Sequence, residues 1–433
     1  MIFSLLSINV LAQEVMTLEK AIIIGLEENF QIKIDEANVR IAENNNSWAR
    51  AGRGPTVDLN GSLTLNFVDD NNPASFLNAP FFTGSLGGSL DANWLVLSGG
   101  RVAIQKDQLD LAIRQQQQLQ GLNAHNVIRE IIRNYNNVLL QQERLDVLRQ
   151  LINLSRDRLA YEEVRKEFGS SNSFNLIQFE DAIYADSANV IAQINQIDIA
   201  KRNVNSILSI STDTEFSYPE KLNVQLEDLD LEKLKDMFLE NSPTLKSLQI
   251  IGELNALNEQ LEQAAKKPTV NINGTVGLSE TYFKILQSEN LAGFPTKGNF
   301  SNQFNAGVGA NLNWNLYNGG VINADIENAK IQKEINELDI LQTTLEISNQ
   351  LDILVANYNS QKELLTLTGD QLSLAKRNLD MSEERFKLGQ ITSLDYRTIQ
   401  VQYLNVAFAR VNAMFTVIST KTEIDWLVGL FNG

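Results

Sequence analysis

The sequence predicts a mainly α-helical chain that also carries transmembrane β-strands and is internally duplicated. Three observations predict this fold class. The two halves of the chain share residues at fixed offsets, four segments alternate polar and apolar residues, and long tracts without proline repeat apolar residues every seven positions. Together they indicate strands that enter a membrane and helices that pack side by side.

The duplication is visible at two offsets. At an offset of 220, five residues of the first half recur in the second: Trp94, Gly99, Gly100, Gly169 and Ser173 return as Trp314, Gly319, Gly320, Gly389 and Ser393. At an offset of 213, residues between Ala51 and Gly61 recur between Ala264 and Gly274. A repeat this long indicates one duplicated architecture. We place the first copy at 13–215, a connector at 216–230 and the second copy at 231–433.

Composition excludes several function classes. The net charge of −17 argues against a nucleic-acid partner, because phosphate backbones attract basic surfaces. The chain has no cysteine, which rules out disulfides, thiolate metal sites and cysteine nucleophiles.

The N-terminal segment 1–12 reads as the remnant of a secretory signal peptide. Residues 2–12 are apolar and uncharged, and Ala12 suits signal peptidase cleavage, although the usual basic start is missing. No other apolar run approaches the length of a membrane-spanning helix, so entry into a membrane requires strands.

Four segments fit that requirement, at about 56–68, 84–96, 269–279 and 304–316. In the first, Val57, Leu59 and Leu63 alternate with Asp58, Asn60 and Ser62. A period of two over about ten residues is typical of a barrel strand, although a half-buried soluble sheet shows it too. Two such segments in each copy favour the barrel.

Aromatic residues mark the predicted membrane boundary. We expect Trp94, Trp314 and Tyr317 to lie at the interface, where amphipathic rings favour the headgroup layer. The polar connectors 69–83 and 280–303 are expected to form long exposed loops. Four strands cannot close a barrel, and open edges in lipid leave backbone groups unsatisfied. Two chains would give eight strands and three would give twelve, and the polar inner faces favour the wider, trimeric option.

The tracts 101–168 and 321–388 are predicted to be helices roughly 100 Å long. In the second tract, apolar residues recur every seven positions in two stripes: Leu351, Tyr358, Leu365, Leu372, Leu379 and Phe386, then Leu367, Leu374, Met381 and Leu388. Two stripes two positions apart lie on nearly opposite sides of a helix, as in a helix with a neighbour on each side. Return helices at 174–209 and 394–428 follow glycine-containing turns.

These motifs, in this order and doubled, make the chain resemble the TolC-type outer-membrane efflux protein family. The resemblance rests on the segments 16–21, 94–101, 385–389 and 393–395 and covers essentially the whole mature chain. It implies a homotrimer whose twelve-stranded outer-membrane barrel, with four strands per chain, is continuous with a long periplasmic α-helical barrel. It further implies contact with outer-membrane lipid and docking to a periplasmic adaptor and an inner-membrane pump.

The resemblance also implies site residues at the helical tips. Residues expected to contact the adaptor are Gly169, Ser170, Ser173, Gly389, Gln390, Ser393 and Leu394. Residues expected at the periplasmic gate are Asp395, Phe386, Ile391 and Thr398. Asp395 matches a family acidic position, but Thr392 and Asp395 also form a helix capping box. Ile391 and Thr398 replace a gate-locking arginine and a second acidic residue, so a salt-bridge lock is not expected.

Enzymatic functions are not supported. His125 is the only histidine and is expected to be a solvated helix residue, and neither a metal-ligand cluster nor a phosphate-binding loop is evident. No cofactor, catalytic residue or metal site is therefore predicted. The leading hypothesis is the exit duct of a tripartite efflux or type I secretion system. The alternative is a secreted, soluble coiled-coil scaffold whose strands pack in a protein core.

Overall fold

The computed structural model describes residues 14–69, 79–286 and 297–431, so the predicted signal segment 1–12 lies outside the described residues. The chain forms two compact units. The helical unit comprises Met1–Val39, Gln116–Gln249 and Leu338–Gly433, and the sheet unit comprises Arg40–Gln115 and Ile250–Glu337. Each unit draws on both copies of the repeat.

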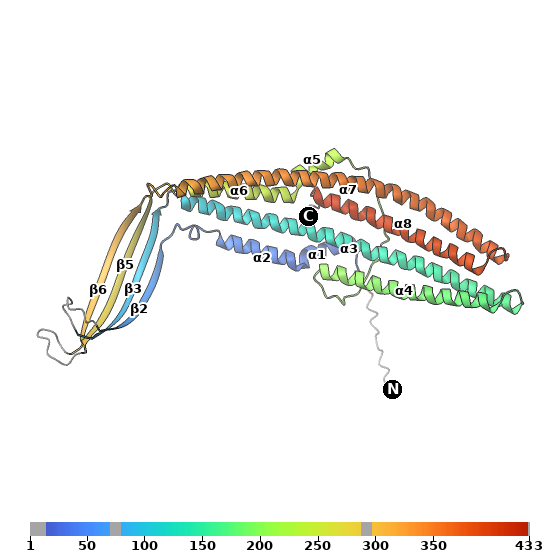
Figure 1. Cartoon of the computed structure of the whole chain (residues 1–433), viewed down its shortest axis with the longest axis horizontal. Coiled ribbons are helices and arrows are strands. Elements are labelled where there is room, and N and C mark those ends of the chain that lie inside the picture. Colours follow the sequence, from blue (N-terminus) through green and yellow to red (C-terminus); the bar gives the residue numbers. More distant parts are fainter. Residues whose placement is uncertain (1–13, 70–78, 287–296, 432–433) are drawn as a thin grey trace, which may run out of the picture. The chain divides into compact units, whose positions relative to one another are not determined.

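The sheet unit is built on four antiparallel strands in the order β2-β3-β5-β6 (Figure 1). The strands are β2 (Thr56–Val68), β3 (Phe81–Leu97), β5 (Thr269–Ile285) and β6 (Asn299–Asn313). Pairing is continuous along all three seams, with one irregularity between Leu95 and Leu97. The two central strands come from different copies of the repeat, and one strand of each copy forms an edge.

Three strands are longer than the alternation predicts, and one of them, β6, also ends earlier. β3 begins at Phe81, and β5 continues to Ile285 because it pairs with β3 as far as Phe81↔Ile285. The predicted loops 69–83 and 280–303 were therefore wrong at their ends. Backbone pairing holds Glu280 and Lys284 in β5, although both residues break the apolar alternation. β6 spans 299–313, so residues 314–316 have already left the sheet.

Long helices make up most of the remainder. α3 (Arg101–Glu167) and α7 (Val321–Lys387) contain 67 residues each, or about 100 Å at the α-helical rise. Each leads through a short turn into a helix of 35 residues, α4 (Ser173–Ile207) and α8 (Ser393–Leu427). Among the described residues, none of the helices combines the length and apolarity needed to cross a membrane.

Several shorter elements have no counterpart among the predictions. They are α1 (Leu18–Glu28), α2 (Phe30–Asn45), α5 (Leu231–Asn241), α6 (Pro243–Ala264), and a two-residue pairing of β1 (Glu14–Val15) with β4 (Phe216–Ser217). Around this pairing, the Tyr135 hydroxyl donates a 3.1 Å hydrogen bond to the Met16 carbonyl oxygen inside one hydrophobic core of the helical unit. Residues Glu14–Met16 are thereby anchored on α3.

The two apolar stripes of α7 have different surroundings. In the first stripe, Leu351, Tyr358, Leu379 and Phe386 are buried within the chain. The second stripe is exposed: Leu367, Leu374, Met381 and Leu388 keep between 57% and 71% of their surface accessible. Within one chain, one side of α7 is therefore buried, and the other side is left exposed.

Candidate functional site

The sheet has one apolar and one polar face. Register pairing aligns Leu59, Leu90 and Val276 in one row, and the next row holds Asn60, Ser89 and Gly277 on the opposite face, since side chains alternate along each strand. The apolar face is open in the single chain, and its exposed residues include Val57, Leu59, Leu63, Leu65, Phe67, Leu86, Leu90, Val276, Leu278, Phe304, Val308 and Leu312. Exposed apolar faces of this kind mark surfaces that contact a membrane or another protein.

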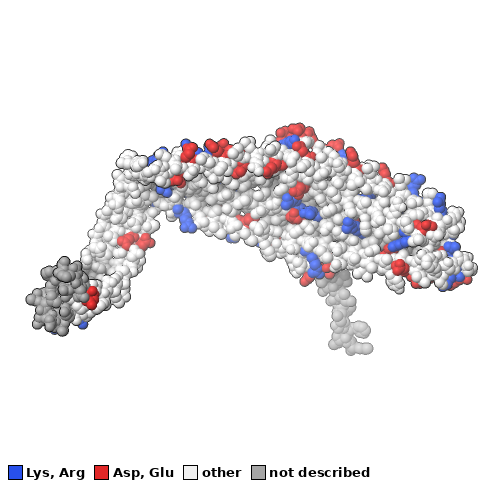
Figure 2. All heavy atoms as spheres, viewed as in Figure 1, with Lys and Arg blue, Asp and Glu red and all other residues white. Residues whose placement is uncertain are grey.

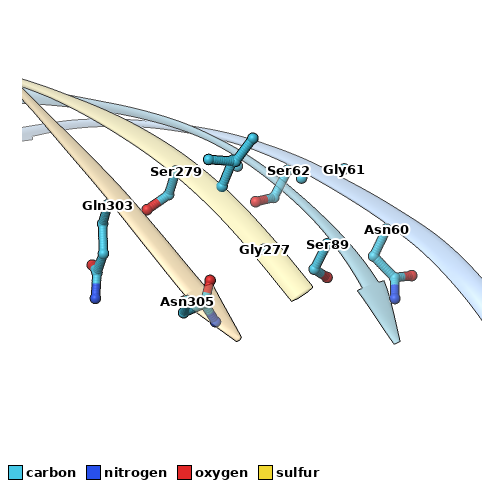
Figure 3. Close-up of a pocket in the computed structure, with 11 residues that line it drawn as sticks. Asn60, Gly61, Ser62, Ser89, Gly277, Ser279, Gln303 and Asn305 are labelled. Carbon is cyan, nitrogen blue, oxygen red and sulfur yellow. The ribbon is translucent and has the colours of Figure 1, made fainter. Parts of the chain in front are cut away.

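The polar face forms a shallow hollow lined by small and amide side chains (Figure 3). Asn60, Ser62, Ser89, Ser279, Gln303 and Asn305 are among the residues around it. Among the described residues of this face, the charged side chains are Asp58 and Asp91, which are direct partners across β2 and β3. Asp91 accepts hydrogen bonds from Thr275 (2.6 Å), Ser89 (2.7 Å) and Asn60 (2.8 Å). The face therefore suits water and hydrated solutes.

Aromatic residues lie toward both ends of the sheet. At the end away from the helices, the ring of Tyr282 lies 6.3 Å from Phe82 and 4.9 Å from Phe300. Sequence reasoning missed this group because all three residues fell within the segments assigned to loops. Toward the helix end lie Trp94, three residues before β3 ends, and Trp314, directly after β6. Tyr317, in the segment between β6 and α7, is 85% exposed.

Trp94 and Trp314 make the same contact in the two copies. The indole Nε1 of Trp94 donates to the carbonyl oxygen of Arg53 at 3.0 Å, and that of Trp314 donates to the carbonyl oxygen of Lys266 at 3.1 Å. Arg53 and Lys266 are themselves equivalent in the repeat, 213 positions apart. Each tryptophan therefore ties the end of one strand to the segment that leads into its neighbour.

The helical tips are the α3–α4 and α7–α8 turns, which share a backbone geometry but differ in their side-chain contacts. Both turns reverse at a glycine with positive φ, Gly169 at 70° and Gly389 at 71°, a conformation that favours glycine. At the first tip, the buried Glu162 accepts hydrogen bonds from Ser171 and Arg165, and Arg165 also donates to the Ser170 carbonyl oxygen. These bonds stabilise the α3–α4 turn.

The second tip is organised by the predicted capping box, which the structure confirms. Thr392 donates to the Asp395 carboxylate through its backbone nitrogen at 3.0 Å and its hydroxyl at 2.7 Å. These bonds hold the pKa of Asp395 below its ordinary value. Ser393 is buried, and its hydroxyl contacts Asn175 and Gln178 of α4, whereas Leu394 is 63% exposed. The backbone nitrogen of Gln390 donates to Arg385 in the turn.

The four predicted gate residues fall into two pairs. Phe386 is buried, with its ring stacked 5.4 Å from Tyr396 and edge-on to Phe179 at 5.6 Å, and Ile391 packs against the same cluster. Asp395 and Thr398 are exposed, and the Thr398 hydroxyl donates back to the helix backbone. Within a single chain, Phe386 and Ile391 therefore stabilise the hairpin packing, and only Asp395 and Thr398 present polar groups to solvent.

Ion pairs link the hairpins near the tips, at positions that sequence reasoning missed. Arg397 of α8 donates two hydrogen bonds, of 2.9 and 2.6 Å, to the buried carboxylate of Asp186 in α4, which also accepts from Ser155 of α3. Arg158 of α3 pairs with Glu383 of α7. Neither pair involves Ile391 or Thr398, so the absence of a salt-bridge lock at those two positions stays a prediction. Asp186 and Arg397 lie 211 residues apart, and no local motif signals such a pair.

Within residues 14–69, 79–286 and 297–431, no group of three His, Cys, Asp or Glu residues could hold a metal ion. His125 is partly buried beside Phe431, and burial lowers its pKa, so the expectation of a solvated histidine was wrong.

Comparisons with known proteins agree with this architecture. The family described as outer membrane efflux protein matches residues 24–209 and 234–422. The chain is 23% identical over 297 residues to the outer membrane protein TolC of Salmonella enteritidis and 22% identical over 300 residues to that of Escherichia coli (strain K12). Each match covers 64% of this chain and 58% of the relative.

Solved structures show the same fold. The Campylobacter jejuni CmeC outer membrane channel superposes with a TM-score of 0.73 at 14% identity, covering 95% of this chain and 85% of that one. The open state of the Neisseria gonorrhoeae MtrE outer membrane channel gives 0.69 at 16% identity, covering 95% and 88%. The predicted fold class is confirmed, and channel relatives support the expectation that the chain is not an enzyme. The two matched segments span most of the sequence, and the chain belongs to the outer membrane efflux protein family.

Proposed function

We propose that three copies of this chain form the outer-membrane exit duct of a tripartite efflux or type I secretion system. The observation that carries the proposal is the four-stranded sheet, which has an exposed apolar face, a polar face and two unpaired edges. In lipid every backbone hydrogen-bonding group needs a partner, so such a sheet must be closed by other chains. Three copies give a barrel of twelve strands, wide enough for a water-filled lumen.

The strand directions allow this closure. Successive strands in the sheet are antiparallel, so the edge strands β2 and β6 run in opposite directions. When copies are arranged in a ring, β6 of one copy meets β2 of the next as an antiparallel pair. Transmembrane barrels of this kind are built from such pairs. The apolar face then contacts lipid and the polar face lines the lumen.

The helices carry a second unpartnered surface that fits the same assembly. On α7, the exposed stripe contains Leu367, Leu374, Met381 and Leu388. On α4, Ile177, Tyr184 and Ile191 are spaced by seven residues and are between 62% and 76% exposed. We propose that the stripe on α4 of one copy packs against the stripe on α7 of the next, as heptad stripes do in coiled coils. This packing would form the wall of the periplasmic helical barrel.

The proposed duct is passive and is gated at its periplasmic end. Closure is supported by the buried Asp186–Arg397 pair, which fastens α8 to α4 near the tip. Three exposed Asp395 carboxylates around a threefold axis would form an acidic ring that favours cations. The turns around Gly169 and Gly389 are the proposed contacts for a periplasmic adaptor, which would connect the duct to an inner-membrane pump.

Labelling of introduced cysteines tests the lumen and lipid assignments, with no background since the chain has no cysteine. Leu59→Cys and Leu63→Cys should react with membrane-restricted reagents, and their strand neighbours Asn60→Cys and Ser62→Cys with water-soluble reagents. The extracted particle should have the mass of a trimer. A soluble monomer with both sets protected from the membrane-restricted reagent would favour the coiled-coil scaffold instead.

A further inference from the structure

The four crossings between sheet and helices, at 46–55, 98–101, 265–268 and 314–320, share an unusual charge. They lie at one end of the sheet, because β2 and β5 begin there and β3 and β6 end there. In a chain of net charge −17, these crossings contain no acidic residue and five basic ones. We name the five the basic collar: Arg50, Arg53, Arg101, Lys266 and Lys267.

The charges of the basic collar are unpaired, although the Arg50 guanidinium donates hydrogen bonds to the neutral amide oxygen of Asn45. Each residue is exposed, and none of them forms an ion pair within the described ranges 14–69, 79–286 and 297–431. Lys106, only five positions after Arg101, shows the contrast, since it pairs with Asp110 at 2.6 Å. Figure 2 shows basic groups where the sheet meets the helices and few charges over the sheet itself. The collar is therefore a concentration of uncompensated positive charge.

The fold holds part of the collar in place. The Arg53 guanidinium lies 4.8 Å above the ring of Trp48, and the Arg53 carbonyl oxygen accepts the indole hydrogen bond of Trp94. The Lys266 carbonyl oxygen accepts the equivalent bond from Trp314. The same geometry in both copies places one basic residue beside each tryptophan, which couples the cationic groups to the two side chains best suited to a membrane interface.

Strand length places the collar at the depth of lipid headgroups. Phe82, in the aromatic group at the far end, and Trp94 are twelve residues apart on β3, or about 40 Å along the strand. A barrel tilt of about 40° reduces this to roughly 30 Å across the membrane, close to the thickness of the hydrocarbon layer. With the far aromatic group at one interface, Trp94 lies at the other, and the collar lies just beyond it.

We propose that the basic collar binds the phosphate groups of anionic phospholipids in the membrane leaflet nearest the helices. This inference rests on the proposed function, because it requires the sheet to span a membrane. Guanidinium groups match phosphate oxygens with paired hydrogen bonds, and lysines add point charges beside them. The collar anchors the chain vertically, since its displacement into the hydrocarbon layer would strip charged groups of water and phosphate partners.

Lipid retention tests the proposal. The full chain is reconstituted into vesicles of equal parts phosphatidylglycerol and phosphatidylcholine, extracted in mild detergent, and the retained lipids are quantified. The wild-type protein should retain phosphatidylglycerol in excess. The variant Arg53→Gln/Lys266→Gln/Lys267→Gln should lose most of that excess, since each basic residue near an anionic surface contributes about fivefold in affinity. The control variant Lys333→Gln/Lys376→Gln/Arg377→Gln removes the same charge from exposed α7 positions and should behave as wild type.

Three outcomes would overturn the proposal. The first is equal retention of phosphatidylglycerol by the collar variant and the control variant. The second is loss of the phosphatidylglycerol excess in Arg53→Lys/Lys266→Arg/Lys267→Arg, a variant that keeps the charge. The third is loss of the phosphatidylglycerol excess from the wild-type protein when inorganic phosphate is added. The last would reassign the collar to free anions. Flotation of the protein with the vesicles measures insertion separately. A wild-type chain that does not float contradicts the proposed duct, whereas one that floats without lipid preference contradicts only the collar.

Discussion

The indole nitrogen of Trp94 donates a hydrogen bond to the backbone carbonyl oxygen of Arg53, and Trp314 repeats the contact with Lys266 in the second copy. A side chain near the end of one strand thus holds the segment that leads into its neighbour. Both copies have this contact, although the residue that accepts the bond is arginine in the first copy and lysine in the second. Since the acceptor is a backbone atom, that difference costs the contact nothing.

Trp94→Phe should destabilise the sheet unit by about 1 kcal/mol, because it removes the donor and keeps an aromatic ring at the boundary. Thermal unfolding of the purified protein measures the effect. Trp48→Phe is the matched control, since Trp48 is 45% exposed against 44% for Trp94, its indole nitrogen donates no bond among the described residues, and phenylalanine keeps an aromatic ring beneath the Arg53 guanidinium. Equal destabilisation by both variants would show that ring size matters and the hydrogen bond does not.

The Asp186–Arg397 pair should contribute strongly to closure of the tip. Asp186→Leu leaves the Arg397 guanidinium without its buried counter-charge, and loss of one partner of such a pair costs about 3–5 kcal/mol. We expect a lower unfolding temperature and a higher single-channel conductance in planar bilayers. The double variant Asp186→Leu/Arg397→Met should recover stability, because it removes both charges together. A double variant as unstable as the single would contradict this account.

The acidic ring of the proposed gate predicts a pH-dependent selectivity. Asp395→Asn should reduce the preference for cations, measured as the reversal potential in a salt gradient. The hydrogen bonds from Thr392 hold the folded-state pKa of Asp395 below its ordinary value, so the cation preference should persist to a lower pH than that of an unpaired aspartate and be lost as the pH falls through the folded pKa. Thr392→Val removes the side-chain donor and should raise that midpoint. Unchanged reversal potentials in Asp395→Asn would reject the ring and leave the duct intact.

Assembly should depend on the exposed stripe of α7. Leu374→Asp places a charge at a side chain that is 61% exposed in the single chain, so the fold of each chain should survive. Burying that charge between copies is costly, and the trimer mass in detergent should fall to that of a monomer. Ser373→Asp adds the same charge at the adjacent exposed residue, off the stripe, and should remain trimeric. A trimeric Leu374→Asp would exclude this stripe from the interface.

Local patterns anticipated much of the architecture. Alternation located the strands because one face is apolar along most of their length, as with Leu59 and Leu63. Heptad spacing located α7 and its two stripes. The alternation failed at Glu280 and Lys284, where pairing with β3 extends the strand beyond the apolar pattern.

Contacts between distant segments could not be predicted. Asp186 and Arg397 are ordinary polar helix residues until the register between α4 and α8 is known. Phe386 was assigned to the gate by position, but its burial against Tyr396 depends on how the hairpins pack. A resemblance to a family predicts where such a residue lies along a helix. It does not predict which side chains of other helices the residue contacts.

The even number of strands in each chain has a consequence for how such proteins change in evolution. With four alternating strands, the two edges of the sheet point in opposite directions. A chain that lost or gained a single strand would present two edges of the same polarity, and every junction in a ring of copies would become parallel. Insertion or deletion of a whole hairpin keeps every junction antiparallel, so it changes the pore by two strands per chain without altering how neighbouring copies pair.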